Sequence, residues 1–398
     1  MKEIKALAKL IVREFKLFKT NSVAVAIFIG APLLYGLIFG FVYNNAKVNN
    51  VPISVLDLDE TPLSHTLIDM LEDNEYVRVE HIRHNESEIR EDLLNNIVAV
   101  ISIPKGFEGD IQQKRHPEIQ VDVNGANIVT ANYANLGIRT VLGTFNAGIE
   151  IKSLNKKGIP TAIAKEQFEA FKINVNRYFN TNSNYLRFMW PGMMGTLMQQ
   201  VFLLVMALSF AREFETGSFS SLKQISDNPF SVLTAKSLPY WVMGVLLWGA
   251  IQWGFFPLFK MPVIHDQWAL FVLVAMFMLA LTNLGVLVSW VIPDQLRATE
   301  ILMVIATPSF VLSGFTWPLS EMPVPLQALA QAIPLTHFLS AFRKVMFYGS
   351  GVNEIIPELN NLAITAVITG VVCLILVTLK LRKTSEKNTE DISEKVIA

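Results

Sequence analysis

The hydrophilic part of the chain contains residue types that hydrolases use. Ser64, His65 and Asp69 supply a hydroxyl, an imidazole and a carboxylate close together in the sequence. A working nucleophile needs a base and an orienting group that are held in place around it. Because these three residues are neighbours on one short predicted helix and have no further partners, we reject a hydrolytic triad. The sequence predicts no catalytic residue.

A metal site and a disulfide have equally little support. His81 and His84 lie three residues apart and Glu80 is adjacent, and imidazole and carboxylate groups do bind metals. The same residues are more typical of a solvated strand end, so we predict no metal site. Cys373 is the only cysteine and lies inside the last apolar segment, where we expect a small buried hydrophobe.

Nucleotide and nucleic-acid chemistry are also unsupported. The sequence has no G-x-x-x-x-G-K-[ST] motif, which is the loop that cradles nucleotide phosphates in P-loop ATPases. Any ATP must therefore be hydrolysed by a separate chain, and we predict no cofactor bound by this one. The net charge is -1, and no basic stripe with interleaved aromatic residues predicts nucleic-acid binding.

A few strongly polar residues lie inside long apolar segments: Gln199, Gln200, Gln252, Thr282 and Asn283. Ionisable residues near the middle of a membrane span usually mark ion or proton pathways. None is found there, which counts against a proton-coupled transporter. The polar residues are either interhelical hydrogen-bonding groups or, together with Pro308 as the expected kink of its span, candidates for a translocation path.

The composition places these residues in a polytopic membrane protein. Of 398 residues, 52% are apolar, and long segments contain no charged residue at all. A helix rises about 1.5 Å per residue, so roughly 20 residues cross a hydrocarbon core of about 30 Å. We predict six spans, at residues 23–43, 190–211, 237–259, 267–292, 299–319 and 362–379.

Residues 320–360 resemble a further span in part, because 322–342 contain no acidic or strongly basic side chain. The prolines at 323, 325 and 334 argue against one continuous helix. A seventh span would also place Lys380 outside. We therefore predict short amphipathic or re-entrant helices on the outer face.

Basic residues predict the orientation, since short cytoplasmic loops carry an excess of Lys and Arg. With both ends inside, the short inner segments hold fifteen Lys and Arg and the short outer loops three. Residues 1–22 are then a cytoplasmic amphipathic helix lying on the membrane surface, its lysines among anionic lipid head groups. The alternative is a simple positively charged flank of the first span, which is also cytoplasmic. Residues 380–398 form a cytoplasmic tail.

The hydrophilic region at 44–189 alternates between strand-like and helical patterns. Strands are predicted at 51–59, 76–81, 98–104 and 118–124, with helices between them, a long helix from Ile128 to the turn at Gly158, and one more strand at 174–180. Such alternation favours an α/β domain with a partly parallel sheet. The predicted fold class is a polytopic α-helical membrane protein with six transmembrane helices and an inserted extracytoplasmic α/β domain.

Several motifs in order resemble a known family. They are VPISVLDLDETPLSHTLI, IPKGFEGDIQQKRHPEIQVDVNGAN, RYFNTNSNYLRFMWPGMMG, AREFETGSFSSLKQISDNPFSVLTAKSLPY and LSGFTWPLSEMPVPLQALAQAIPLTHFLSAFRKVMFYGSG. Together they resemble the permease subunit of ABC-2 type bacterial exporters, in the subgroup with a large periplasmic domain. The similarity covers nearly the whole chain. Ser218, Ser220 and Ala235 depart from the family's usual residues at their positions.

The resemblance implies a set of partners. The family works as a dimer of permeases, here a second copy or a paralogue, with two separate ATP-binding subunits that carry ATP and Mg²⁺. It implies a bacterial inner-membrane location, with 44–189 periplasmic and able to meet an adaptor and an outer-membrane channel. The N-terminal helix and the cytoplasmic 212–236 loop would form the ATPase-docking surface, with these candidate residues in the loop: Arg212, Glu213, Glu215, Gly217, Ser218, Leu222, Pro229 and Lys236.

The predicted function is therefore that of a non-catalytic permease subunit of an ATP-driven exporter of amphiphilic or hydrophobic substrates. A short loop joined rigidly to two spans can carry an ATPase movement into the membrane helices. One alternative is a membrane-anchored binding or assembly protein, which would tolerate a scrambled 212–236 loop. The other is a proton-coupled exporter, which the missing midplane carboxylates weaken.

Overall fold

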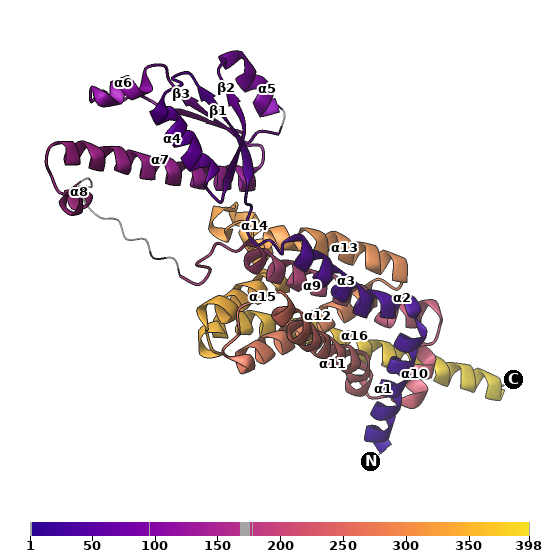
Figure 1. Ribbon diagram of the computed structural model, residues 1–398. Helices are drawn as coiled ribbons and strands as arrows, with labels where there is room; N and C mark the ends of the chain where they lie inside the picture. The colour runs from indigo at the N-terminus through magenta and orange to yellow at the C-terminus, as the bar shows by residue number, and fades with distance from the viewer. Residues whose placement is uncertain (1, 95, 168–175, 177, 398) are drawn as a thin grey trace. The chain divides into compact units, whose positions relative to one another are not determined.

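The computed structural model describes residues 2–94, 96–167, 176 and 178–397, and the chain divides into two compact units. The membrane unit combines Met1–Ala46 with Tyr178–Ala398, and the α/β unit is Lys47–Arg177. Figure 1 shows the elements of each unit. The predicted hydrophilic domain, 44–189, is longer than the α/β unit, because the residues from Tyr178 onward group with the membrane helices.

The membrane unit has six helical segments, among the described residues, that are long and apolar enough to cross a membrane, which confirms the predicted fold class. The first, Ser22–Val42, contains α2 (Ser22–Val25), the π-helical turn η1 (Ala26–Gly30) and α3 (Ala31–Val42). The next four are α9 (Tyr185–Glu215), α11 (Pro229–Leu258), α12 (Gln267–Val291) and α13 (Gln295–Leu312). The sixth, Asn353–Arg382, consists of the turn η5 (Asn353–Ile355) and the first part of α16 (Ile356–Ile397).

Several helices begin or end away from the predicted span limits. α9 runs from Tyr185 to Glu215 and α11 starts at Pro229, because polar residues outside a hydrocarbon core can still continue a helix. α13 ends at Leu312 rather than 319. Gly314 follows with a φ of 75°, a left-handed conformation that glycine adopts freely and that ends helices.

Helix α9 is the central helix of the membrane unit. In its most apolar 18-residue stretch 72% of residues are buried, against 22% to 50% in the other five segments. At its start the indole of Trp190 donates to the carbonyl of Gly36 in α3 at 3.0 Å, and the ring lies edge-on to Phe255 and Phe256 of α11. The interior of the unit is therefore assembled around this helix.

The pair Gly36 and Gly40 lets α3 approach α11. A Cβ at Gly36 would lie 2.3 Å from the Phe255 ring, and one at Gly40 would lie 1.9 Å from the Phe259 ring. No side chain fits at such distances, so the two phenyl rings occupy the space that the glycines leave. The close contact between the two segments is therefore made by aromatic side chains.

Short helices occupy the range 320–360, where the sequence predicts them. They are η3 (Leu319–Glu321), α14 (Val324–Gln331), α15 (Pro334–Arg343) and the π-helical turn η4 (Lys344–Tyr348). Pro325 and Pro334 lie in the first turns of α14 and α15, where the missing N–H is tolerated. Lys344 pairs with Glu358 of α16 at 2.6 Å, so this segment is fastened to the last span.

The α/β unit contains a four-stranded sheet of order β2-β1-β3-β4. β1 (Val51–Asp57) is parallel to β2 (Val77–Arg83) and β3 (Ala99–Ile103), and β4 (Gln120–Val123) is antiparallel to β3. The predicted partly parallel sheet is thus confirmed. The strand predicted at 174–180 lies largely outside the described residues, and 178–180 are not in a strand.

Helices cover this sheet and close its core. They are α4 (Pro62–Glu72), η2 (Glu86–Glu88), α5 (Ile89–Leu94), α6 (Phe107–Gln112), α7 (Ile128–Lys156) and α8 (Thr161–Gln167). Leu67 of α4 and Ile138 and Phe145 of α7 share one buried cluster with the strands. The unit therefore has a hydrophobic core of its own, separate from that of the membrane helices.

The residues considered for catalysis and metal binding have structural roles in this unit. The hydroxyl of Ser64 donates to Asp57 at 2.6 Å and also receives the N–H of Thr61 in a capping box that starts α4. Nδ1 of His81 lies 3.3 Å from Asp92. No group of three or more His, Cys, Asp and Glu side chains gathers as a metal site within the described residues.

Candidate functional site

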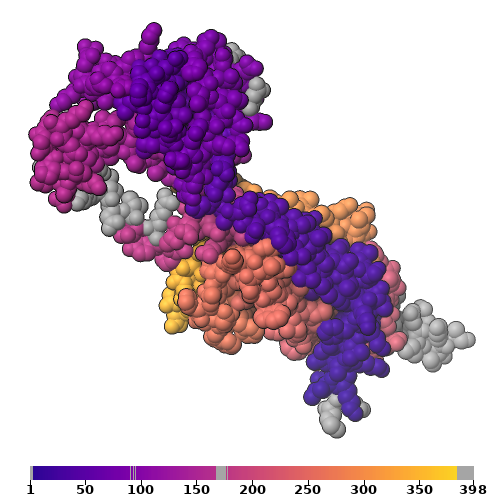
Figure 2. Space-filling view, viewed as in Figure 1, coloured from indigo at the N-terminus to yellow at the C-terminus, as the bar shows by residue number. Residues whose placement is uncertain are grey.

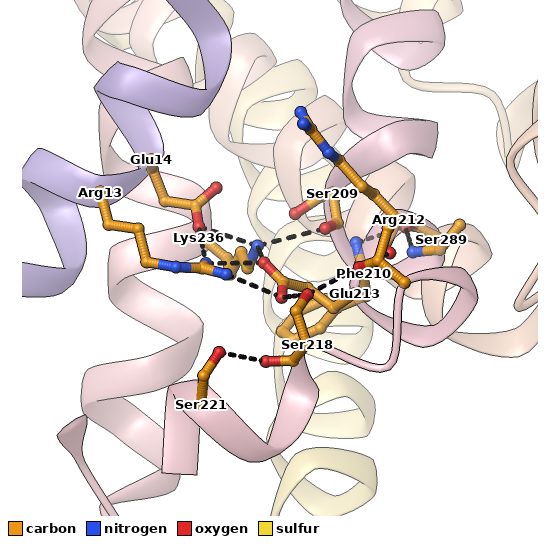
Figure 3. A network of polar contacts seen from close by, with 12 residues as sticks. Arg13, Glu14, Ser209, Phe210, Arg212, Glu213, Ser218, Ser221, Lys236 and Ser289 are labelled. Carbon is orange, nitrogen blue, oxygen red and sulfur yellow. Dashed lines mark hydrogen bonds and ion pairs between the residues drawn. The ribbon is translucent and has the colours of Figure 1, made fainter. Parts of the chain in front are cut away.

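Four charged side chains meet at the end of α9, and we call them the ionic cluster: Arg13, Glu14, Glu213 and Lys236. Arg13 and Glu14 belong to α1 (Lys2–Thr20), Glu213 to the last turn of α9 and Lys236 to the second turn of α11. Figure 3 shows the two α1 side chains reaching toward Glu213 and Lys236, whereas Arg212 points away. The N-terminal helix α1 thus meets two helices that lie about 200 residues further along the chain.

The geometry of the cluster is that of paired ions. Two guanidinium nitrogens of Arg13 donate to the two carboxylate oxygens of Glu213, at 2.7 and 3.0 Å. The ammonium of Lys236 lies 2.7 Å from Glu213 and 2.8 Å from Glu14. Two cations and two anions alternate, so the charges cancel within the cluster.

Three of the four side chains are buried and Arg13 is partly buried, so the buried charges need their partners. Glu213 and Lys236 are each 1% exposed and Glu14 is 3% exposed. A buried charge without a partner is strongly unfavourable, and the bidentate geometry of an arginine–carboxylate pair offsets much of that penalty. The hydrogen bond to Glu213 also holds the pKa of Arg13 above its usual value. The cluster therefore holds α1 firmly against α9 and α11.

Further bonds extend the cluster to other elements. Lys236 also donates to the backbone carbonyl of Ser209 at 3.2 Å, and the hydroxyl of Ser218 donates to Glu213. On the other side of α9, the hydroxyl of Ser289 in α12 accepts hydrogen bonds from the backbone N–H of Phe210 at 2.7 Å and of Ala211 at 2.9 Å. The end of α9 is thus bonded to α1, α11, α12 and the following turn.

The turn after α9 is formed at Gly217 and leads into a short helix. Gly217 has a φ of 65°, the left-handed conformation that commonly follows a helix and that glycine adopts without strain. The short helix α10 (Phe219–Ile225) then turns Phe219 and Leu222 inward. Phe219 packs edge-on to Trp290 of α12 at 5.8 Å between ring centroids. α10 is therefore anchored by its apolar side.

Two more of the predicted loop residues have helix-terminal roles. Glu215 accepts a hydrogen bond from the backbone N–H of Gln295, the first residue of α13, at 2.6 Å. Pro229 is the first residue of α11, and the Asn228 side chain caps that helix by accepting the Phe230 N–H at 3.0 Å. The predicted 212–236 loop is thus largely helical, and its non-helical residues are 216–218 and 226–228.

Burial divides the predicted docking residues into two groups. Glu213, Leu222 and Lys236 are at most 1% exposed, so in this structure their side chains contact other parts of the chain. Arg212 and Ser218 are partly buried, whereas Glu215 and Gly217 are exposed. The exposed positions that the prediction omitted are Thr216, Ser220, Gln224, Asp227 and Phe230.

Three of the predicted translocation residues form separate hydrogen bonds. Thr282 bonds the carbonyl of Met278 in its own helix at 2.6 Å, and Gln252 bonds Gln267 at 2.8 Å. Asn283 donates to the Ala366 carbonyl of α16 at 2.9 Å, as an interhelical tie. Pro308 lies on an exposed face of α13, and Gln200 is half-buried.

Gln199 remains the candidate with free bonding capacity. Its side chain is 2% exposed, and its carbonyl oxygen has no hydrogen-bond partner among the described residues. Buried polar groups are nearly always hydrogen-bonded. An unpaired amide in the central helix is therefore available to a ligand, a water or a different conformation.

Sequence reasoning missed Arg13 and Glu14, although a signal for Glu14 exists. Leu10, Glu14 and Phe18 follow one another at four-residue intervals, and Leu10 and Phe18 are 1% and 9% exposed. Residues four apart share a helix face. A carboxylate in the middle of the apolar face of a basic helix indicates a buried cationic partner.

Comparison with known proteins places this site in a family. A model of the ABC-2 family transporter proteins matches residues 23–377. The chain belongs to this family. The match includes Glu213 and Lys236 but begins after α1, so the α1 half of the ionic cluster lies outside the matched residues.

Individual relatives of this ABC-2 protein are permeases. The inner membrane transport permease YhhJ of Escherichia coli K12 is 24% identical over 374 residues, which cover 87% of this chain and 91% of that protein. The probable multidrug ABC transporter permease YbhS of the same organism is 23% identical over 326 residues, covering 80% and 82%. The linearmycin resistance permease LnrN of Bacillus subtilis is 24% identical over 378 residues, covering 86% and 91%.

The family match confirms the resemblance seen in the sequence and makes the chain a multi-pass ABC-2 transporter permease. Membership implies an ABC ATPase partner and, as is usual in the family, a dimer. The ionic cluster is then a feature of the membrane subunit itself.

Proposed function

We propose that this chain is the membrane-spanning permease subunit of an ATP-driven exporter that moves amphiphilic or hydrophobic molecules out of the cytoplasm or the inner membrane. A separate ATPase subunit, carrying ATP and Mg²⁺, would supply the energy. The names of relatives, which include a probable multidrug permease and a linearmycin resistance permease, support an apolar or amphiphilic cargo. The sequence contributes no P-loop of its own.

The ionic cluster is the observation that carries the proposal. α1 alone is an amphipathic surface helix, but Arg13 and Glu14 bond it to α9 and α11. A push on α1 would therefore reach two spans through direct side-chain bonds. In Figure 2 the N-terminal helices lie on the outside of the membrane unit, where a partner has access to them.

The docking surface we propose combines the exposed side of α1 with the exposed residues of the α9–α11 connection. Ile4 and Val12 of α1 are 72% and 54% exposed, and Phe230 is 66% exposed. Exposed apolar side chains of this size on a polar rim favour a protein partner. Glu215, Thr216, Gln224 and Asp227 supply the polar part of that surface.

The arrangement in the membrane is also part of the proposal. Both termini would be cytoplasmic and residues 44–189 outside, which the excess of basic residues on the inner segments supports. A second copy or a paralogue would complete the dimer. α13 carries exposed Ile301, Met303, Val304 and Ile305, an apolar face suited to a neighbouring permease or to lipid. A periplasmic adaptor remains an expectation from the resemblance.

Reconstitution tests the proposal directly. The chain and its cognate ATPase would be placed in proteoliposomes, and uptake of a panel of fluorescent amphiphiles would be measured with ATP added outside. We expect ATP-dependent, vanadate-sensitive transport that a proton ionophore does not abolish. Transport driven by a pH gradient without the ATPase would support the proton-coupled alternative instead. Failure of the ATPase to co-purify with the chain would favour the membrane-anchored binding protein.

A further inference from the structure

The α/β unit contains a groove that the transport proposal does not use. It has a volume of about 600 Å³ and lies between α6, residues 114–119 and the second half of α7. All of its lining residues belong to the α/β unit and to the described part of the chain. The groove is therefore a property of this unit by itself.

The floor of the groove is apolar. Phe107 and Phe145 stack with their ring centroids 6.2 Å apart and an interplanar angle of 15°, and both rings are almost fully buried. Ile111, Leu142 and Ile149 continue the apolar lining along α6 and α7. A surface of this kind binds hydrocarbon by removing it from water.

The rim of the groove is basic. Lys114, Arg115, His116 and Lys157 line it, and Glu150 is the acidic residue among the lining residues. Arg115 pairs with Asp110 at 3.3 Å, whereas Lys114, Lys157 and Glu150 form no salt bridge within 4.0 Å among the described residues. Both lysines line the same groove. The interaction with Lys157 lowers the pKa of Lys114, and the Glu150 carboxylate acts on that pKa in the opposite direction.

Lys114 is brought to the groove by the end of α6. Its φ is 57°, and the N–H groups of Lys114 and Arg115 bond back to the carbonyls of Ile111 and Asp110 at 3.0 and 2.8 Å. This is a common way for a helix to end. It turns the chain out of α6 and places Lys114 on the rim of the groove that Lys157 also lines.

We propose that this groove binds a free single-chain amphiphile with a carboxylate head group, such as a long-chain fatty acid. The head group would lie between Lys114 and Lys157 and relieve the repulsion between their ammonium groups. The hydrocarbon chain would lie along Phe107, Phe145 and Ile149. The proposal goes beyond export, since binding here requires neither ATP nor the partner ATPase.

Photolabelling of the full-length protein tests the site. The protein in nanodiscs would be irradiated with dodecanoic acid carrying a diazirine on its chain, and labelled peptides would be identified by mass spectrometry. We expect label in residues 107–119 and 142–157 that unlabelled dodecanoate displaces and dodecyltrimethylammonium does not. Equal displacement by the cationic amphiphile, or label confined to the membrane helices, would overturn the proposal. Displacement by anionic phospholipid alone would point to a membrane lipid as the occupant and would also overturn it.

Charge variants give the matching genetic test. In Lys114→Glu/Lys157→Glu we expect specific labelling of the two peptides to fall at least about tenfold, the equivalent of losing one charge-assisted hydrogen bond. Lys114→Gln/Lys157→Gln should fall less. Arg139→Glu changes the charge on α7 at an exposed position that does not line the groove, so its labelling should stay unchanged.

Two controls separate loss of the site from loss of structure. Hydrogen exchange of β1 and β3 in each variant would report whether the sheet is intact. Unchanged labelling in the double reversal variant with an intact sheet would overturn the proposal. Because labelling is measured without ATP, a failed transport assay would not affect this result.

Discussion

At the scale of single residues, Glu213 shows how burial changes the interpretation of a motif. The acidic residue lies in the segment where the sequence predicts ATPase docking, yet its carboxylate is 1% exposed and accepts hydrogen bonds from Arg13, Lys236 and Ser218. The Glu213 carboxylate therefore interacts with groups inside the membrane unit. Any effect of its substitution on transport must pass through the position of α1, α9 and α11.

Substitution of Glu213 should destabilise this junction strongly. In Glu213→Gln, Arg13 and Lys236 keep only Glu14 as an anionic partner, and breaking a buried ion pair costs about 3 to 5 kcal/mol. We expect a lower thermal midpoint of the purified protein in nanodiscs and faster hydrogen exchange in α1. The exposed Ser220→Ala is the control and should match the wild type.

A double variant distinguishes this charge effect from a simple loss of packing. Arg13→Gln/Glu213→Gln removes one cation and one anion together, so it should be less destabilised than the sum of the two single variants. Strict additivity of the three measured stabilities would show that the Arg13–Glu213 pair contributes nothing to the junction.

The Asp92 carboxylate predicts a pH dependence for the α/β unit. The guanidinium of Arg83 donates a hydrogen bond to it at 2.8 Å, and the hydroxyl of Ser54 donates another at 2.6 Å. The pKa of Asp92 is lowered, and the largest cause is the hydrogen bond from Arg83. A folded-state pKa below the unfolded value of about 3.9 means that the stabilisation is present above that value and is lost as the pH falls through the folded pKa.

Hydrogen exchange of the full-length protein as a function of pH measures this effect. We expect β1 and α5 to lose protection when the pH is lowered below about 4. Asp92→Asn should already be less protected at neutral pH and should lack this part of the pH dependence. Asp69→Asn, at an exposed position of α4, should keep the wild-type profile. An unchanged profile in Asp92→Asn would show that the Arg83 pair does not stabilise the fold.

At the scale of elements, the contact between α3 and α11 depends on the size of two glycines. Gly40→Val would place side-chain atoms where the Phe259 ring now lies, since even a Cβ would be 1.9 Å from it. Overpacking of this kind costs about 1 to 3 kcal/mol. Thermal unfolding in nanodiscs should show a lower midpoint for Gly40→Val. Gly249→Val in α11 meets no atom within 4 Å of its Cβ and should unfold like the wild type.

Local sequence patterns predicted most elements, because each depends on neighbours in the chain. The strands of the α/β unit follow alternating Val and Ile, and β1 and β3 were predicted within two residues of their ends. The extent of the 212–236 helices was missed, since polarity was taken as evidence for a loop. Gly217 after α9 and Asn228 with Pro229 before α11 are ordinary helix end and start signals, and they would have shown both boundaries.

The candidate site was less predictable for a physical reason. Arg13 and Glu213 are 200 residues apart in the sequence, and no periodicity connects such a pair. The sequence indicated which segment mattered but not that its charges face inward. Likewise, nothing local distinguishes Asn283, which bonds across to α16, from Gln199, whose carbonyl oxygen has no partner among the described residues.

At the scale of the whole molecule, the chain combines two units with separate hydrophobic cores. In the membrane unit, the ionic cluster fastens the surface helix α1 to the central helix α9 and to α11. Hydrogen bonds of Glu215 with Gln295 and of Ser289 with Ala211 also connect α9 to α13 and α12. A displacement of α1 should therefore move a connected set of spans rather than one helix end.

This connection predicts an uncoupling phenotype, given the export function proposed above. Arg13→Ala removes the bond from α1 to Glu213 but leaves the exposed Ile4 and Val12 of the helix and the partner ATPase unchanged. ATP hydrolysis by the reconstituted complex should then persist while the amount of substrate transported per ATP falls several-fold. Lys16→Ala removes a cation from an exposed position of the same helix and should transport like the wild type. If Arg13→Ala inserted normally and kept the wild-type ratio of transport to hydrolysis, the cluster would be a stabilising feature only, and the coupling path would have to run through α10.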